Sequence, residues 1–325
     1  MRVLYLNHPE SDYGGAFLWH GLCVVLGAEN VFDLPVKQSY HGQVHRYALP
    51  NIPNGITAPL PWMPAYPLAW TAHNVIEQTA MEHARHLLNI DFFDLVIVES
   101  PRARALETCA QLRDLIRIPL VLHDGEDYER VTSHAMAVRP AAVLKREVLR
   151  GAPLAQSGVP IIPCPFSFPD AALPVLNGYA ANSSERIAAP QYDVVFSMGR
   201  TCDRRQEVAD ALRGATDLRT HVALAPDHST RTAGGSNPVL LPYFDYLKLM
   251  RTSTNMAVSV RGFGWDTCRY WEAPQCAVML CDDVPLNLPH PFEHGVTCLR
   301  YHDPAHCVSL VREYKSKPDD LARIF

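Results

Sequence analysis

Three arginines follow a predicted buried strand in the second half of the chain, and their spacing suits an anionic ligand. The run Tyr192 to Phe196 predicts the strand, and Gly199 provides a turn before a helix that ends near Leu212. Guanidinium groups at a helix N-terminus suit a diphosphate by charge and by bidentate geometry. A surface ion-pair network is the alternative. The three residues are Arg200, Arg204 and Arg205.

A second pattern of strand, glycine turn, helix and strand covers residues 255–283. Met256 to Val260 predicts a buried strand, and Ala277 to Cys281 predicts the next one. Between them lies a turn whose backbone N–H groups, at the start of a helix, would favour an anion. An ordinary βαβ unit with a structural turn is the alternative. The candidate binding residues of this unit are Gly262, Phe263, Gly264, Asp266, Arg269 and Glu272, and Asp282 and Asp283 close it.

Carboxylates follow a predicted strand of the first half, Pro119 to His123. Ligands of open α/β sheets bind beyond the carboxyl ends of strands, so these groups are candidates for a general base. They are Asp124, Glu126 and Asp127, and Asp12 near the N-terminus is a fourth candidate. A solvated turn that caps the next helix is the alternative.

Two adjacent cations, Lys145 and Arg146, lie in residues 141–149. They could pair with the acidic cluster or contact an anionic ligand, and Lys145 is the candidate for substrate binding. The surface of a plain helix is the remaining interpretation.

Gly14 and Gly15 follow the first predicted strand, residues 2–8, and precede a predicted helix from Ala16 to Leu26. Glycines at such a turn let another molecule approach the backbone, so both are candidates for substrate binding. A complete G-x-G-x-x-G motif is absent, which argues against a dehydrogenase.

Two successive series of strands and helices must position all these residues. A length of 325 residues, at roughly 150 residues per domain, predicts two domains. The predicted class is α/β with two Rossmann-like domains, residues 1–168 and 191–325, joined by a connection over 169–190. Residues 36–70 are rich in proline and show no period, so we predict an irregular insertion, either an acceptor-binding lid or a surface excursion.

Composition excludes several classes of protein. The chain has 48% hydrophobic and 19% charged residues, and its net charge is −5, which describes an ordinary globular protein without a general nucleic-acid-binding surface. We find neither a signal peptide nor an apolar run of about 18 residues, so we expect a cytoplasmic protein without a membrane span. Nine scattered cysteines form no C-x-x-C pair, and no Cys/His quartet has zinc spacing, so we predict reduced thiols and no metal.

Several motifs resemble those of GT-B fold glycosyltransferases, in particular the CgeB-like, exostosin-like and glycosyltransferase group 1 branches. In the C-terminal half these motifs are Tyr243-Phe244-Asp245-Tyr246-Leu247, Leu249-Met250-Arg251-Thr252-Ser253, Gly262-Phe263-Gly264-Trp265-Asp266-Thr267, Arg269-Tyr270-Trp271-Glu272-Ala273, Pro291-Phe292-Glu293-His294-Gly295 and Tyr301-His302-Asp303. In the N-terminal half they are His20-Gly21-Leu22, Asp124-Gly125-Glu126-Asp127 and Lys145-Arg146-Glu147.

The resemblance implies two Rossmann-like domains facing across a cleft, with a nucleotide-sugar donor on the second and an acceptor on the first. Glu272 matches the last glutamate of the family's E-x7-E motif, which binds the donor ribose. Gly264 stands where the first glutamate is expected, so this chain departs from the retaining pattern, and Asp266 is a candidate replacement. Family members usually need no metal or cofactor, and the acceptor could be a glycan, a protein, a small molecule or a modified nucleobase.

Two other functions fit the same motifs. A degenerate GT-B protein could hold a nucleotide or a glycan without turnover, which the missing glutamate and the abrupt end of the sequence suggest. A different sugar-nucleotide enzyme on the same scaffold, such as an epimerase, is the third hypothesis.

Overall fold

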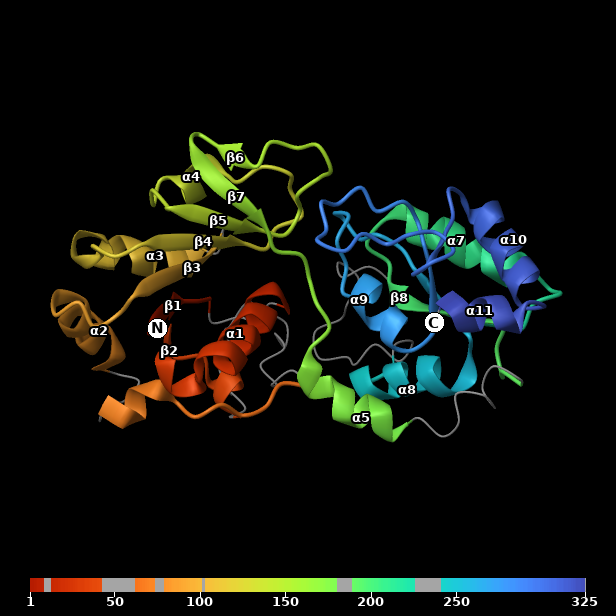
Figure 1. The fold of residues 1–325 in the computed structure, drawn as a ribbon, viewed down its shortest axis with the longest axis horizontal. Helices are drawn as coiled ribbons and strands as arrows, with labels where there is room; N and C mark the ends of the chain where they lie inside the picture. Colours follow the sequence, from red (N-terminus) through yellow and green to blue (C-terminus); the bar gives the residue numbers. More distant parts are fainter. Residues whose placement is uncertain are drawn as a thin grey trace. The chain divides into compact units, whose positions relative to one another are not determined.

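The computed structural model describes residues 1–8, 13–42, 62–73, 79–100, 103–179, 189–225 and 241–324. The chain divides into two compact units, Met1–Pro165 and Phe166–Phe325, and Figure 1 shows a sheet with helices in each. Asp12 and the middle of the predicted insertion, residues 43–61, lie outside the described residues. The predicted connection, residues 169–190, includes the short 3-10 segment η6 (Asp170–Ala172) and the helix α5 (Leu173–Gly178).

The first unit is built on a sheet whose described strands have the order β2-β1-β3-β4-β5-β7-β6. Neighbouring strands are parallel, except that β6 is antiparallel to β7. The strands are β1 (Val3–Leu6), β2 (Val31–Leu34), β3 (Leu95–Ser100), β4 (Leu120–Asp124), β5 (Ala142–Lys145), β6 (Ala155–Gln156) and β7 (Val159–Pro163).

Helices cover both faces of this sheet, as the alternation of side chains along the strands requires. Leu4 and Leu6 join a core that includes Leu106 of α3. Tyr5, on the opposite face of β1, contacts Trp19 of α1 with ring centroids 5.8 Å apart. The helices are α1 (Tyr13–Leu26), α2 (Ala80–Asn89), α3 (Ala103–Leu112) and the short α4 (Ser133–Met136), with 3-10 segments η1 (Ala28–Asn30), η2 (Gln38–His41), η3 (Ala69–His73) and η5 (Arg113–Leu115).

The helical interpretation of residues 141–149 is wrong. Residues 142–145 form β5, which pairs with β4 on one side and β7 on the other. The charged sequence Lys145-Arg146-Glu147 is typical of a helix surface, but all three side chains are buried. Pairing with two neighbouring strands therefore outweighs the local preference of this segment for a helix.

The second unit holds a five-stranded sheet in the order β12-β11-β10-β8-β9, with every neighbouring pair parallel. Its strands are β8 (Val194–Gly199), β9 (Thr220–Ala225), β10 (Met256–Ser259), β11 (Val278–Cys281) and β12 (Leu299–Arg300). Its further helices are α7 (Asp203–Gly214), α8 (Tyr243–Ser253), α9 (Arg269–Glu272), α10 (Pro304–Tyr314) and α11 (Pro318–Ile324), with the 3-10 segment η8 (Ala273–Gln275) after α9.

One face of the second sheet packs against α7, α10 and α11. Phe196 and Val258 share a core with Leu212 of α7, Val311 of α10 and Leu321 of α11. On the other face of β10, the Ser259 hydroxyl donates a hydrogen bond of 2.9 Å to the Arg269 carbonyl of α9. Helices α7, α10 and α11 therefore cover one face of the sheet, and α9 lies on the other. The residues at the ends of the strands lie at the edge where the two faces meet.

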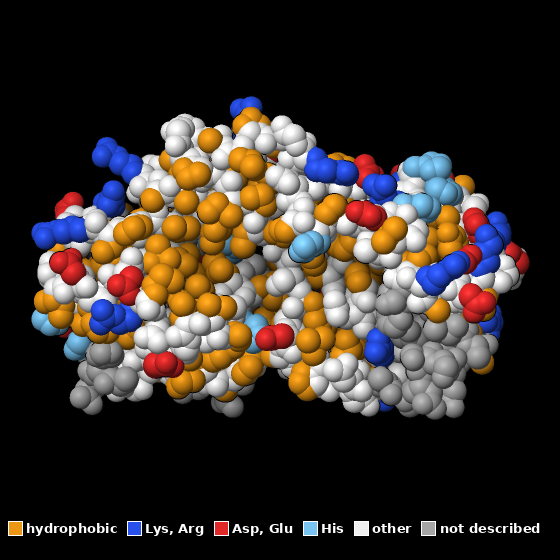
Figure 2. Space-filling view, in the orientation of Figure 1, with side chains coloured by type: hydrophobic (Ala, Val, Ile, Leu, Met, Phe, Trp, Pro, Cys, Tyr) orange, Lys and Arg blue, Asp and Glu red, His pale blue; other side chains and the backbone are white. Residues whose placement is uncertain are grey.

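The surface gives no sign of a polyanion-binding stripe on the face that Figure 2 draws. Lysine and arginine side chains lie scattered there among aspartate and glutamate side chains. Among the helices in the described ranges, none is both long and apolar enough to cross a membrane.

Candidate functional site

The second sheet has its topological switch point between β8 and β10. The chain leaves β8 for β9 on one side and returns to β10 on the other side. Open parallel sheets bind ligands beyond the carboxyl ends of the strands at such a point. β8 ends at Gly199 and β10 ends at Ser259. The predicted arginines and the predicted glycine turn therefore both follow strands that end at the same edge of the sheet.

Arg205 joins the two strand ends. From the first turn of α7, its side chain donates to the carbonyl oxygens of Gly199 (2.7 Å), Val260 (3.1 Å) and Arg261 (2.9 Å). The side chain is buried, and burial lowers the pKa of its guanidinium. These bonds hold the loops after β8 and β10 against each other, so Arg205 shapes the site.

The other two predicted arginines are more accessible than Arg205. The Arg200 side chain is 48% exposed and lies 3.6 Å from Asp203, and Arg204 lies 3.5 Å from Glu207. Arg204 also donates a bond of 2.6 Å to the His302 carbonyl after β12. The surface ion pairs that the sequence suggested therefore exist. Pairs with such exposure are weak, and a bound phosphate could replace them.

The glycine turn does not lead directly into a helix, contrary to the prediction. The helix α9 begins at Arg269, five positions after Gly264, and has only four residues. Gly262 packs near Arg205, because a Cβ added there would lie 3.5 Å from its Nη2. Phe263 is 72% exposed. The loop thus presents one exposed ring at the edge of the sheet, while Gly262 is half-buried and Gly264 is buried.

Asp266, a predicted replacement for the missing glutamate, is held inside its own unit. Its Oδ2 accepts a hydrogen bond of 2.6 Å from the Phe166 amide. Its Oδ1 accepts a bond of 3.0 Å from the Trp271 indole. Both oxygens of this buried carboxylate thus anchor the loop.

Glu272 lies on α9 and forms an ion pair with Arg269 through its Oε2. The Arg269 guanidinium also stacks on Tyr246 of α8, 4.3 Å from the ring centroid. Burial lowers the pKa of Arg269, but the charge and hydrogen bond of Glu272, together with Tyr246 and Cys268, outweigh burial and leave the pKa above its usual value.

Tyr243 of α8 is a residue of this region that the sequence did not single out for binding. Its hydroxyl is buried without a hydrogen-bond partner in the described part of the chain, as is the Arg269 Nε. Burial, with the nearby Glu272 charge, raises the pKa of Tyr243. These unpaired polar atoms beside a carboxylate leave hydrogen-bonding capacity that a polar ligand or an ordered water could use.

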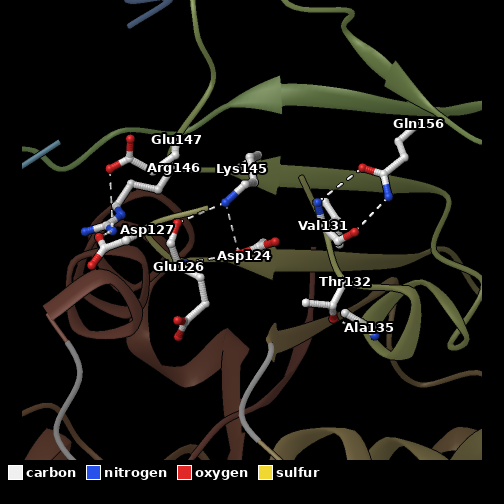
Figure 3. A network of polar contacts seen from close by, with 10 residues as sticks. All are labelled: Asp124, Glu126, Asp127, Val131, Thr132, Ala135, Lys145, Arg146, Glu147 and Gln156. Atoms are coloured by element: carbon white, nitrogen blue, oxygen red, sulfur yellow. Dashed lines mark hydrogen bonds and ion pairs between the residues drawn. The ribbon is translucent and has the colours of Figure 1, made fainter. Parts of the chain in front are cut away.

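Two of the predicted carboxylates of the first unit, Asp124 and Asp127, are paired with cations, as Figure 3 shows. Asp124 ends β4 and accepts a bond of 3.2 Å from the Lys145 ammonium, which also donates to the Glu126 carbonyl at 3.0 Å. Arg146 pairs with Asp127. The predicted pairing of the two cations with the acidic cluster is therefore confirmed.

The capping alternative for this cluster is wrong, because Thr132 caps α4 by accepting a bond from the Ala135 amide. Burial raises the pKa of Asp124, although Lys145 opposes that shift. Asp124 and Lys145 are buried against each other, with side-chain exposures of 4% and 0%. Their ion pair joins the end of β5 to the end of β4 and to the loop after it. The catalytic role predicted for Asp124 and the substrate-binding role predicted for Lys145 stay predictions.

Gly14 and Gly15 lie in the first turn of α1, and Gly15 packs on a residue that the sequence analysis missed. A Cβ added at Gly15 would lie 2.4 Å from the Oε1 of Glu99. Glu99 lies in β3 and is 1% exposed, and its Oε2 accepts a bond of 3.0 Å from the His8 amide. In the sequence, Glu99 could have been singled out as an acidic residue directly after the apolar run Leu95–Val98.

This close approach makes a prediction for Gly15→Ala. We expect the substitution to lower the free energy of unfolding by about 1–3 kcal/mol, because the new methyl group overlaps a buried carboxylate. Gly21→Ala in the same helix is the matched control, since a Cβ there meets no atom within 4 Å. We expect that variant to gain about 0.5–1 kcal/mol from helix propensity. Urea unfolding of both variants measures the difference, and equal effects would contradict the packing argument.

Comparisons with known proteins identify the fold. Neither a family model nor a curated protein matches the sequence. Two solved structures align over 100% of this chain and 92% of their own. HepE from Anabaena, solved with UDP and glucose, has 12% identity and a TM-score of 0.52. Sucrose-phosphate synthase from Thermosynechococcus elongatus has 12% identity and a TM-score of 0.54.

Such identities show the fold alone. The chain has the GT-B fold, with two α/β units that each contain a mainly parallel Rossmann-like sheet. The predicted fold class is confirmed.

Proposed function

We propose that this protein is a glycosyltransferase that moves a sugar from a nucleotide-sugar donor to an acceptor hydroxyl, without a metal ion or another cofactor. One observation carries the proposal. Arg205 binds the loops after β8 and β10 together at the switch point of the second sheet, where a parallel sheet of this kind receives its ligand. The structural similarity to HepE, which was solved with UDP and glucose, supports a nucleotide-sugar ligand.

The donor would use the accessible groups around this clamp. Arg200 and Arg204 would donate to the diphosphate, and the loop over residues 262–264 would leave space for it. Glu272 would accept a ribose hydroxyl through Oε1, since Oε2 pairs with Arg269. Cations on the leaving diphosphate stabilise the charge that develops as the sugar–phosphate bond breaks, which is the main catalytic need of the reaction. On the motif resemblance alone, we propose the CgeB-like or exostosin-like branch for this enzyme.

Thermal stabilisation by a panel of nucleotide sugars tests this proposal. A ligand at 100 times its Kd should stabilise the folded chain by about 2.7 kcal/mol. We expect Arg200→Ala to weaken the bound donor by about 10- to 100-fold, because a charged hydrogen bond to phosphate is lost. Arg213→Ala is the matched control, since Arg213 lies in the last turn of α7, the helix that follows Arg200, and is 45% exposed beside Asp210. A parent chain that responds to no donor, or equal weakening in both variants, would overturn the assignment.

A binding module without turnover is the second candidate. The observation in its favour is that both oxygens of Asp266 are held by Phe166 and Trp271, so Asp266 is poorly placed to replace the missing glutamate. Donor binding without release of free nucleotide, in the presence of candidate acceptors, would support this function. Release of nucleotide would support the transferase.

A further inference from the structure

Two polar residues meet at the switch point of the first sheet. The parallel strands β1 and β3 pair with Leu6 opposite Val98, so the next positions, Asn7 and Glu99, are neighbours near the carboxyl ends of the two strands. The chain leaves β1 for β2 on one side, and β3 lies on the other. This is the position in the first unit where an open parallel sheet offers a ligand site.

Both side chains belong to the face that α1 covers. Tyr5 is on this face, because its hydroxyl donates a bond of 3.3 Å to the Gly15 carbonyl. Asn7 follows Tyr5 by two positions and therefore shares its face. Glu99 lies there as well, in contact with Gly15 in the first turn of α1. Carboxamide and carboxylate thus lie beside the start of a helix of 14 residues.

Asn7 is the residue that points to a ligand. It is 0% exposed, and neither Nδ2 nor Oδ1 has a hydrogen-bond partner in the described ranges. An unpaired buried amide destabilises a fold by about 1–3 kcal/mol, and leucine has nearly the same shape without that penalty. A buried amide with two unused hydrogen-bonding atoms is therefore best explained by a partner that binds there.

Glu99 supplies the charge of the pair. The His8 amide donates to its Oε2, and the first turn of α1 places the positive end of a helix dipole beside it. Both features place a hydrogen-bond donor or a positive partial charge beside the carboxylate oxygens, which can accept hydrogen bonds and, from a substrate, a proton. A carboxylate beside a carboxamide suits hydroxyl groups. The carboxylate accepts hydrogen bonds from them, and the carboxamide can both donate and accept hydrogen bonds.

We infer that Asn7 and Glu99 bind the hydroxyl group of a sugar or polyol acceptor, and that Glu99 is its general base. This inference rests on the proposed transferase function. As the acceptor oxygen forms a bond to the anomeric carbon of the donor sugar, the bond from that carbon to the diphosphate oxygen breaks. The electron pair leaves with the diphosphate, and the hydroxyl proton passes to Glu99 and then to solvent. A single displacement of this kind inverts the anomeric configuration.

Two near-isosteric variants of the full chain test the inference. Ligand-observed NMR with methyl hexopyranosides and glycerol as probes should detect binding by the parent, and Asn7→Leu and Glu99→Gln should lose it. With a donor that the parent consumes, Glu99→Gln should lower turnover about 10²- to 10⁴-fold, as expected for a general base, and leave donor affinity unchanged. Glu107→Gln is the control, because Glu107 is an exposed carboxylate on α3 of the same unit. It should behave like the parent.

The stability of Asn7→Leu separates a ligand site from a structural role. A ligand-binding amide without an internal partner predicts an unchanged or higher unfolding midpoint for this variant, whereas a structural amide predicts a large decrease. That decrease, a parent that binds none of the probes, or sugar binding that survives in both variants would overturn the inference. If sugar binding depends on Asn7 and Glu99 while no nucleotide sugar binds, the donor proposal fails and the hydroxyl site stands.

Discussion

Arg205→Met is expected to lower the free energy of unfolding by about 3–5 kcal/mol. The substitution keeps much of the buried aliphatic volume but removes the guanidinium bonds to the carbonyl groups of Gly199, Val260 and Arg261. The Arg261 carbonyl keeps the Cys202 thiol as a donor at 3.4 Å. Each buried acceptor that loses its partner costs about 1–3 kcal/mol, and part of that is recovered when the loops rearrange. The same rearrangement should separate the two loops of the proposed donor site, so nucleotide-sugar binding should fall as well.

Chemical denaturation followed by circular dichroism measures this loss. Arg204→Met is the control, since Arg204 is the adjacent arginine on α7 but has one carbonyl partner and a side chain 21% exposed. We expect it to lose about 0.5–1.5 kcal/mol. Similar losses in the two variants would show that Arg205 is not the clamp that the geometry indicates. Arg205→Lys should recover only a small part of the stability, because an ammonium cannot reproduce the planar fork.

Glu272→Ala is expected to lower the free energy of unfolding by about 3–5 kcal/mol and to abolish donor binding. The first effect arises because the variant leaves the Arg269 charge in a mostly buried environment without its carboxylate partner. The second arises because the ribose loses its acceptor. A single variant confounds these two roles, so it cannot assign Glu272 to the donor site.

The double variant Arg269→Met/Glu272→Leu separates them. Removing both members of a buried ion pair and filling the space with apolar groups is often close to neutral for stability. We therefore expect the double variant to unfold near the parent and still to show no stabilisation by nucleotide sugars. Denaturation curves with and without donor give both quantities. Donor stabilisation equal to that of the parent would remove Glu272 from the site and leave it a purely structural role.

Much of the secondary structure could be predicted because its signals are local. The predicted strand from Val31 to Leu34 agrees with β2 residue for residue. Gly27 directly follows α1 with φ of 84°, a conformation that glycine adopts easily, and the helix stops there as predicted. The helix from Pro304 begins after Asp303, whose carboxylate accepts a bond of 2.7 Å from the His306 amide.

The candidate site was harder to predict, because its residues acquire their roles through distant partners. Arg205 was grouped with Arg200 and Arg204, yet its bonds to the loop after β10 make it a clamp. Lys145 was predicted to bind substrate, which stays a prediction, and the fold buries its side chain beside Asp124. Charge and position along the chain do not reveal these partners. Only the burial of each side chain in the folded protein distinguishes a cation that holds loops or strands together from one that remains accessible to a ligand.

The amino-acid sequence by itself determined that this chain forms two α/β units, since apolar runs and glycine turns specify strands and helices within a few residues of themselves. The tertiary structure alone decided which strand ends become neighbours. Asn7 and Glu99 are far apart in the chain and meet only because β1 and β3 are adjacent and in that register. Sheet order depends on the packing of the whole unit, so neither segment alone predicts that Asn7 and Glu99 become neighbours.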